Sequence, residues 1–164
     1  MRAPVAACIG LGSNLADPVA QVRQAFAALA RLLDTRLIGR SSLWRSTPMG
    51  PADQPDYVNA VAMLETGLAP LDLLDALQAI EQEQGRVRDG TRWGPRTVDL
   101  DLLLYGETTM NDARLTIPHP GLCERDFVLV PLLEVAGPEW PVPGHGRLGE
   151  LIVPAAHGLE RIDA

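Results

Sequence analysis

Residues 97–105 constrain the fold most, because their aliphatic side chains recur at every second position, which is the period of a β-strand. One face of this strand is predicted to carry Val98, Leu100, Leu102 and Leu104. The opposite face receives the other residues: Thr97, Asp99, Asp101, Leu103 and Tyr105. The stretch is therefore predicted to be a strand with one apolar face packed on a core.

The two aspartates of this strand need an explanation, because aspartate is depleted in strands. Residues two apart project to the same side, with Cα atoms about 6.6 Å apart. Carboxylates this close raise each other's pKa unless a cation lies between them. Oxygen ligands favour Mg²⁺ or Mn²⁺ over zinc or copper. Asp99 and Asp101 are candidate metal ligands; the alternative is an exposed edge where both only meet water.

A loop rich in arginine precedes the strand, and it is interrupted by three glycines and a proline. Its guanidinium groups belong to Arg86, Arg88, Arg92 and Arg96. Surface ion pairs with the aspartates are the ordinary interpretation, each worth roughly 0–1 kcal/mol. A loop of this length in a compact domain is more often a functional lid than a connector. Arginines beside metal-binding carboxylates suit a metal polyphosphate such as Mg·ATP.

The net charge and the residue composition exclude several classes of function. The net charge is −7, which argues against a general nucleic-acid binder. All 14 basic residues are arginine, so a P-loop lysine and a catalytic lysine are excluded. The 164 residues suffice for one domain, and Cys8 and Cys123 provide no disulfide framework. Because neither a signal peptide nor a membrane span is recognisable, we expect a cytoplasmic protein.

Periodicity and turn residues divide the rest of the chain into elements. Further strands are predicted at residues 4–12, 36–45 and 57–66, with a short extended piece at 115–120. Helices are predicted at residues 18–34, 70–85, 127–136 and 148–155, the first capped by Asp17 and containing Leu33 in its buried stripe. The order predicts an α+β, ferredoxin-like β-α-β-β-α-β sandwich with a C-terminal helical extension. That fold settles no function.

Three polar residues stand out in these elements. Asn59 lies in the middle of a strand, where a buried amide needs partners that a ligand's edge could supply. Glu81 continues the apolar stripe of its helix, so it is either a ligand contact or an acid that pairs with Arg88 or meets solvent. His119 and Cys123 make only half of a zinc site, and a structural hydrogen bond is the ordinary interpretation of such a histidine.

Four segments resemble 6-hydroxymethyl-7,8-dihydropterin pyrophosphokinase, a family of folate biosynthesis. They are GLGSNL (10–15), DQPDYVNAV (53–61), RWGPRTVDLDLLLYG (92–106) and PHPGLCERDFVLVPLLEVAG (118–137). The resemblance implies a single pyrophosphokinase domain over residues 1–164 that transfers the β,γ-diphosphoryl group of ATP to the pterin's hydroxymethyl oxygen and releases AMP. It also implies two Mg²⁺ ions, and we expect a monomer that binds neither membrane nor nucleic acid.

The same resemblance implies roles for individual residues. The catalytic set is Arg86, Arg96, Asp99 and Asp101, of which the two aspartates would hold both Mg²⁺ ions. The nucleotide contacts are Gln78, Glu81, Arg88, Trp93, Arg96, Leu102, Arg114, Thr116, His119 and Arg125. The pterin contacts are Ser46, Thr47, Pro48, Met49, Tyr57, Asn59, Trp93 and Phe127. Ser46 replaces the family's usual threonine and keeps its hydroxyl, whereas Cys123 replaces a polar or basic residue.

Two rival functions remain open at this point. A ferredoxin-like sensor of small ligands would not need Asp99 and Asp101 for catalysis. A Mg²⁺-dependent phosphohydrolase could use the same residues with water as the nucleophile, and it would release phosphate or pyrophosphate.

Overall fold

One antiparallel sheet forms the middle layer of the protein. The structure is a computed structural model and describes residues 3–13, 17–46, 57–86, 98–122, 126–151 and 159–163. Its strands are β1 (Val5–Ser13), β2 (Thr35–Arg40), β3 (Leu43–Ser46), β4 (Tyr57–Thr66), β5 (Asp99–Tyr105), β6 (Met110–Asn111), β7 (Thr116–Ile117), β8 (Pro141–Val142), β9 (Gly146–Arg147) and β10 (Leu159–Asp163). Its helices are α1 (Pro18–Leu29), α2 (Pro70–Arg86), α3 (Asp126–Ala136) and the short 3₁₀ helix η2 (Leu148–Glu150).

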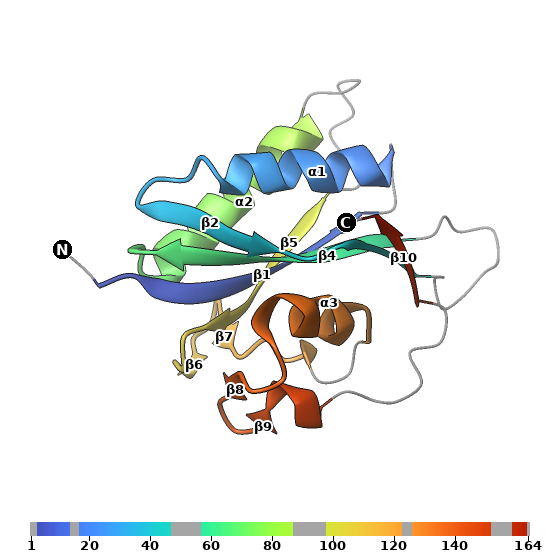
Figure 1. Cartoon of the computed structure of the whole chain (residues 1–164). Helices are drawn as coiled ribbons and strands as arrows, with labels where there is room; N and C mark the ends of the chain where they lie inside the picture. The colour runs from blue at the N-terminus through green and yellow to red at the C-terminus, as the bar shows by residue number, and fades with distance from the viewer. Residues whose placement is uncertain are drawn as a thin grey trace.

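The order of the strands confirms the ferredoxin-like prediction. The main sheet runs β10-β3-β4-β1-β5, and β2 also pairs with β4. Helices α1 and α2 cover one face of this sheet, and α3 covers the other (Figure 1). Among the described strands β5 lies at an edge, so one side of its backbone is available to other partners.

Two hydrophobic cores hold these layers together. The first lies under α1 and α2 and includes the predicted stripe of α2, with Leu73 and Leu77 fully buried. The second lies under α3, where Leu129 and Leu132 pack against Val61 of β4. Because the sheet is covered on both faces, β5 is apolar on both, and the prediction of a single apolar face was incomplete.

A bulge corrects the predicted alternation of β5. The register of β1 against β5 shifts between Cys8 and Ile9, which oppose Leu104 and Leu102. Leu104 therefore joins Leu103 in the core under α3, while Tyr105 joins the core under α1 and α2. The predicted alternation assigned Leu104 and Tyr105 each to the face on which the other lies. The difference arises because a bulge adds one residue to one strand and so exchanges the two faces for the residues beyond it.

The first helix begins as predicted and ends early. Asp17 caps α1, and its side chain accepts a hydrogen bond from the Ala20 N–H at 3.4 Å. The helix ends at Leu29, and the positive φ of 51° at Asp34 turns the chain into β2. Leu33, predicted inside the buried stripe, is 83% exposed, so that part of the prediction was wrong.

The predicted strand at residues 36–45 is divided into β2 and β3. Ser41 and Ser42 separate the two strands, and the Ser41 N–H donates to the Val61 carbonyl at 2.8 Å. At the C-terminus, α3 matches its prediction, whereas the helix predicted from residue 148 is only η2, and residues 152–158 lie outside the description. Strand β10, which pairs with β3, was not predicted. No described helix is long and apolar enough to cross a membrane.

Candidate functional site

The strand register brings the two most informative groups of polar residues onto one face of the sheet. Asn59 of β4 lies opposite Gly12 of β1, and Gly12 lies opposite Asp99 of β5. Residues directly opposite in an antiparallel pair point to the same face. This face is the one that α3 covers, because Val61, two residues beyond Asn59, packs under α3. Asp101, two residues beyond Asp99, points the same way.

Two glycines form the floor between these groups. Gly12 separates Asn59 from Asp99, and Gly10 lies opposite Asp101. Since neighbouring strands are about 4.8 Å apart, Asn59 and Asp99 flank this floor at about 10 Å. A Cβ atom on Gly12 would meet the Asn59 Oδ1 atom at 3.0 Å. Sequence reasoning gave neither glycine a role, although two glycines at one-residue spacing in a strand are a sign of close approach above one face.

At the β4 end of the floor the site is buried and neutral. Asn59 is 7% exposed, and its Nδ2 donates to the Ser46 Oγ at 3.0 Å. Ser46 lies opposite Tyr57, which is 37% exposed. The structure therefore brings together three of the predicted pterin contacts. It supplies Asn59 with a partner from the protein, where the sequence suggested a ligand.

At the β5 end the site is open and acidic. Asp99 is exposed, and 45% of the Asp101 side chain is exposed. The His119 Nε2 atom lies 4.0 Å from the Asp101 Oδ2 atom. Because the Gly121 N–H donates to His119 Nδ1 at 3.0 Å, a neutral imidazole carries its proton on Nε2, facing the carboxylate.

The donors at this end suit magnesium rather than zinc. Within the described ranges, no three histidine, cysteine, aspartate or glutamate side chains gather closely enough to hold a metal. Mg²⁺ keeps several waters and needs only one or two carboxylates plus substrate phosphates. Asp99 and Asp101 fit that requirement, because both belong to one face of β5 and both reach solvent. Cys123, the other half of the zinc alternative, lies outside the description.

A pocket of about 300 Å³ opens at the free edge of β5. It contains five residues predicted for the metal or the nucleotide: Asp101, Leu102, Arg114, Thr116 and His119. The remaining lining residues are Leu74, Leu100, Asp112, Ala113, Leu115 and Pro120. Its wall is therefore aliphatic on the α2 side and polar where β5 faces β7.

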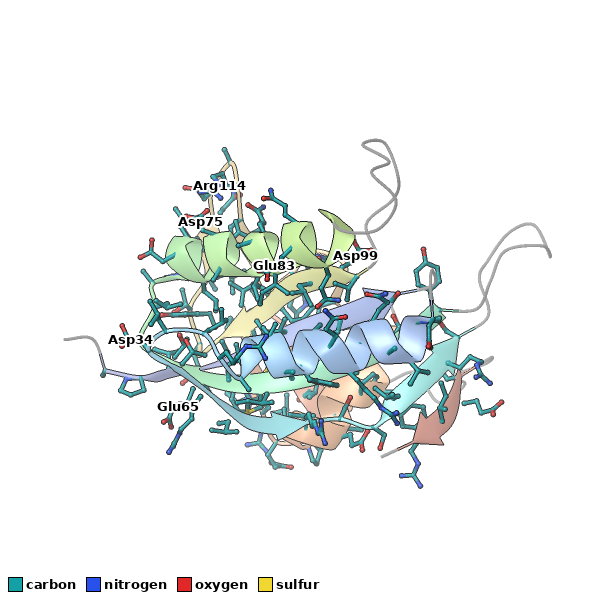
Figure 2. The ribbon with its side chains drawn as sticks, turned by 90° about the horizontal axis from the view of Figure 1, so that it is seen from above. Asp34, Glu65, Asp75, Glu83, Asp99 and Arg114 are labelled. Carbon is teal, nitrogen blue, oxygen red and sulfur yellow. The ribbon has the colours of Figure 1, made fainter. Side chains whose placement is uncertain are left out.

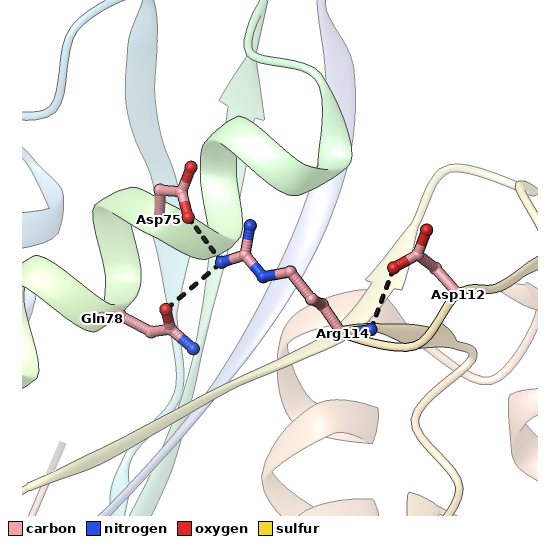
Figure 3. A network of polar contacts seen from close by, with 4 residues as sticks. All are labelled: Asp75, Gln78, Asp112 and Arg114. Carbon is pink, nitrogen blue, oxygen red and sulfur yellow. Dashed lines mark hydrogen bonds and ion pairs between the residues drawn. The ribbon is translucent and has the colours of Figure 1, made fainter.

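Arg114 is held at this pocket by a small network (Figure 3). Its guanidinium donates to the Asp75 Oδ1 at 2.6 Å and to the Gln78 Oε1 at 3.4 Å, and its backbone N–H donates to the Asp112 carboxylate at 2.9 Å. The hydrogen bond to Asp75 raises the pKa of Arg114 further. Both side chains of the ion pair are about half exposed, so the pair adds little stability. Gln78, a predicted nucleotide contact, thus lies beside Arg114.

Glu81 lies on the inward face of α2, and its carboxylate contacts the backbone of β5. Its predicted pairing with Arg88 falls on a residue outside the described ranges. The Glu81 side chain is buried, with 6% exposure, and its Oε2 accepts the Leu100 N–H at 2.7 Å. The expectation that it might meet solvent was wrong, because the inward face of α2 carries it against the edge of β5.

Several predicted residues lie outside what the structure describes. They are Thr47, Pro48, Met49, Arg88, Trp93, Arg96 and Arg125. For Arg86 and Phe127 the structure describes only the backbone, in α2 and α3. Of the described site, Figure 2 shows Arg114 and Asp75 together over the first half of α2, and Asp99 toward its other end.

The fold and these residues define an α+β protein with a ferredoxin-like sheet and a polar site at the edge of β5. Residues 8–137 match a single family, described as 7,8-dihydro-6-hydroxymethylpterin-pyrophosphokinase. The chain belongs to this family.

Two relatives are named 2-amino-4-hydroxy-6-hydroxymethyldihydropteridine pyrophosphokinase. The protein from Pseudomonas aeruginosa is 54% identical over 155 residues, which cover 94% of each chain. The protein from Haemophilus influenzae is 57% identical over 148 residues, covering 90% of this chain and 91% of the relative. The resemblance stated from four short motifs is therefore confirmed over most of the chain.

Solved structures support the fold. The HPPK-DHPS protein of Plasmodium falciparum, solved as wild type with pterin and p-hydroxybenzoate, superposes with a TM-score of 0.74 at 13% identity. Its A437G variant with SDX-DHP superposes with a TM-score of 0.76 at the same identity. Each match covers 99% of this chain but less than half of the other, at 47% and 49%.

Proposed function

We propose that this chain transfers the β,γ-diphosphoryl group of ATP to the hydroxymethyl oxygen of 6-hydroxymethyl-7,8-dihydropterin, giving the pterin diphosphate and AMP. Family membership supports the reaction. The observation that carries the assignment to this site is the row Asn59, Gly12, Asp99, which places an amide and a carboxylate on either side of a glycine floor. A pterin ring bound beside Asn59 would direct its hydroxymethyl group toward ATP phosphates held beside Asp99.

The nucleotide half of the proposal rests on the pocket at β5. Its volume of about 300 Å³ is at the small end of ligand pockets, which span about 300–1,000 Å³, and it suits the nucleoside part of ATP. Leu74, Leu100 and Leu102 supply an apolar wall for a base. Arg114, Thr116 and His119 supply donors on the opposite side, where the ribose and phosphates would lie.

Asp99 and Asp101 would hold two Mg²⁺ ions together with the ATP phosphates. When bound, these ions would neutralise the phosphate charge that otherwise repels an incoming oxygen. The side-chain oxygens of Asp101 would also accept the His119 Nε2–H as the two groups approach, which orients the imidazole toward the phosphates. Arginine is the only long basic side chain that this sequence offers for the remaining phosphate charge.

The pterin half needs little chemical activation from the protein. Ser46 and Asn59 present neutral hydrogen-bonding groups to a flat ring edge, and the Tyr57 ring is exposed beside them for stacking. Holding the two substrates in line supplies a large part of the rate, since positioning converts a bimolecular step into a unimolecular one. The chain's contribution is therefore orientation and charge neutralisation, without a general base.

The proposal extends to residues whose side chains the structure does not describe, on the strength of the family motifs alone. Arg86, Arg88, Arg96 and Arg125 would bind phosphates, Trp93 would close over the site, and Phe127 would stack on the pterin opposite Tyr57. Thr47, Pro48 and Met49 would line the pterin pocket. We further propose that the chain acts as a single-domain monomer in the cytoplasm.

A product assay tests the proposed function. Purified protein is incubated with ATP, Mg²⁺ and 6-hydroxymethyl-7,8-dihydropterin, with an EDTA control, and nucleotides and pterins are separated by chromatography. AMP that appears in step with a diphosphorylated pterin, and only with metal, is the expected result. ADP with a monophosphorylated pterin would contradict diphosphoryl transfer. Phosphate or pyrophosphate without a phosphorylated pterin would identify a hydrolase, and binding without turnover a sensor.

A further inference from the structure

The edge of β5 that faces α2 is anchored by one buried side chain. The Leu100 N–H points away from β1 toward α2, where the Glu81 Oε2 accepts it at 2.7 Å. This length lies within the ordinary range of N–H···O hydrogen bonds, about 2.7–3.2 Å. The bond joins two elements that are 19 residues apart in the sequence.

The Glu81 carboxylate is buried between α2 and β5, and this burial needs a physical explanation. On the inward face of α2, Glu81 follows the buried Leu77 and Ile80 and precedes the buried Gln84, whose amide donates to Gln21. Burying a carboxylate is unfavourable unless it is well paired, and an apolar residue there would avoid the penalty. The bond to Leu100 gives the carboxylate a structural purpose at the edge of the sheet.

Leu100 lies between the two candidate metal ligands. The nitrogen of Leu100 is joined to Asp99 and its carbonyl carbon to Asp101. The orientation of the Leu100 amide therefore sets the direction of the side chains on both sides of it. On the other side of β5, these aspartates oppose Gly12 and Gly10, which have no side chains to brace them. His119 lies 4.0 Å from the Asp101 carboxylate, while the direction in which both aspartate side chains leave the strand is set by the backbone of β5, which Glu81 holds at the edge that faces α2.

We propose that Glu81 is a positioning residue, which fixes the aim of Asp99 and Asp101 through the Leu100 amide. It is not a third metal ligand, because no metal-holding group of three such side chains forms among the residues that the structure describes. The nucleotide contact that the sequence resemblance implied for Glu81 stays a prediction, which the kinetic test below distinguishes from positioning. This inference rests on the proposed function for its catalytic consequence, but the anchoring itself can be measured without turnover.

Hydrogen exchange of the full-length protein tests the anchoring. In Glu81→Ala we expect the Leu100 amide to exchange at least about tenfold faster than in wild type, after normalisation to the buried strand β4. Glu81→Gln keeps an acceptor oxygen and should restore most of the protection. The matched control is Glu83→Ala, which removes an exposed carboxylate from the same helix and should leave Leu100 unchanged. Equal protection of Leu100 in wild type and Glu81→Ala would overturn the inference.

The Mg²⁺ dependence of turnover tests the consequence. Glu81→Ala should lower kcat by about tenfold and raise the free Mg²⁺ needed for half-maximal rate, with the KM for pterin unchanged. Glu81→Gln should lie near wild type. A change in the KM for ATP alone would overturn the inference and support a nucleotide contact, and equal loss in the alanine and glutamine variants would overturn it in favour of a role for the charge. Failure of wild type to make pterin diphosphate would refute the proposed function while the exchange result still decides the anchoring.

Discussion

The two ends of the glycine floor have opposite physical characters. At β4, Asn59 is buried and its polar hydrogens meet the neutral Ser46 hydroxyl, whereas at β5 the Asp99 and Asp101 carboxylates reach solvent. A neutral ring edge is recognised by hydrogen bonds for which water competes. The side chains that bind it must therefore be shielded from water and held in one conformation. A hydrated metal and a polyphosphate require the reverse, because Mg²⁺ gives up its waters reluctantly. Substitutions at the two ends should therefore change different kinetic constants.

Loss of a carboxylate at the β5 end should give the largest effect. We expect Asp101→Ala to lower turnover about a thousandfold, since the charge of the transferred group then lacks its metal. The thermal unfolding temperature should stay close to wild type, because the side chain is half exposed. Glu65→Ala is the control, since Glu65 is an exposed carboxylate that pairs with Arg36. Near-normal turnover in Asp101→Ala would rule out metal catalysis at this strand.

A methyl group in the floor should affect the β4 end. In Gly12→Ala the new Cβ would lie 3.0 Å from the Asn59 Oδ1 and push the amide away. We expect the KM for pterin to rise about tenfold, corresponding to about 1.4 kcal/mol, with a smaller change in the KM for ATP. Gly39→Ala is the control, since its Cβ would make only ordinary contacts, the nearest at 3.7 Å. A larger effect on ATP than on pterin would reverse the assignment of the two ends.

Removing the partner of Asn59 should give a smaller effect on the same constant. Ser46→Ala leaves the buried Nδ2 without its bond of 3.0 Å, which costs about 1 kcal/mol and should raise the KM for pterin about fivefold. Ser46→Thr keeps the hydroxyl and serves as the control. Steady-state kinetics with each substrate varied in turn would check this prediction, and a fivefold loss in the threonine variant would contradict it.

Glu134 of α3 accepts hydrogen bonds from Ser42 and from Trp44 of β3, and this contact predicts a pH dependence of stability. Burial raises the pKa of Glu134, but hydrogen bonds from Ser42 and Trp44 lower it more, so the net shift is below the ordinary value of 4.5. A lowered carboxyl pKa adds stability that is complete above pH 4.5 and is lost as the pH falls. Glu134→Gln should therefore reduce the free energy of unfolding by more at pH 7 than at pH 3. Urea unfolding at the two pH values measures this, and an equal difference at both would contradict it.

The exposed ion pair at the pocket should matter least. Asp75→Asn removes the partner of Arg114, but the two side chains are 58% and 47% exposed and water replaces the bond. We expect the Kd for ATP to change by less than about twofold, and less still at high salt. Calorimetric titration at two salt concentrations would measure it. A tenfold change would mean that Asp75 orients Arg114 for the nucleotide.

Local patterns predicted those parts of the protein that depend on local geometry. The stripe of α2 and the shared face of Asp99 and Asp101 follow from the periods of helix and strand. The cap at Asp17 follows from the chemistry of one side chain. The family motifs then named residues that the structure gathers at the β5 pocket, such as Arg114 and His119.

Long-range contacts explain what could not be predicted. The division of β2 from β3 depends on Glu134, which is 92 residues from Ser42, whose N–H it accepts. Strand β10 forms only because β3 offers it an edge. The burial of Glu81 depends on an amide in β5 that needs an acceptor. The residue pattern of a single segment does not predict these three contacts, because each joins segments that are brought together only when the sheet forms.

The most direct test of the two-ended site is a Mn²⁺ titration followed by electron paramagnetic resonance, with a non-hydrolysable ATP analogue present. Wild type and Ser46→Ala should bind two Mn²⁺ ions with the nucleotide, because the β4 end takes no part in holding metal. Asp99→Asn and Asp101→Asn should each lose at least one ion or bind it more than about tenfold more weakly. Unchanged stoichiometry and affinity in both aspartate variants would contradict the account.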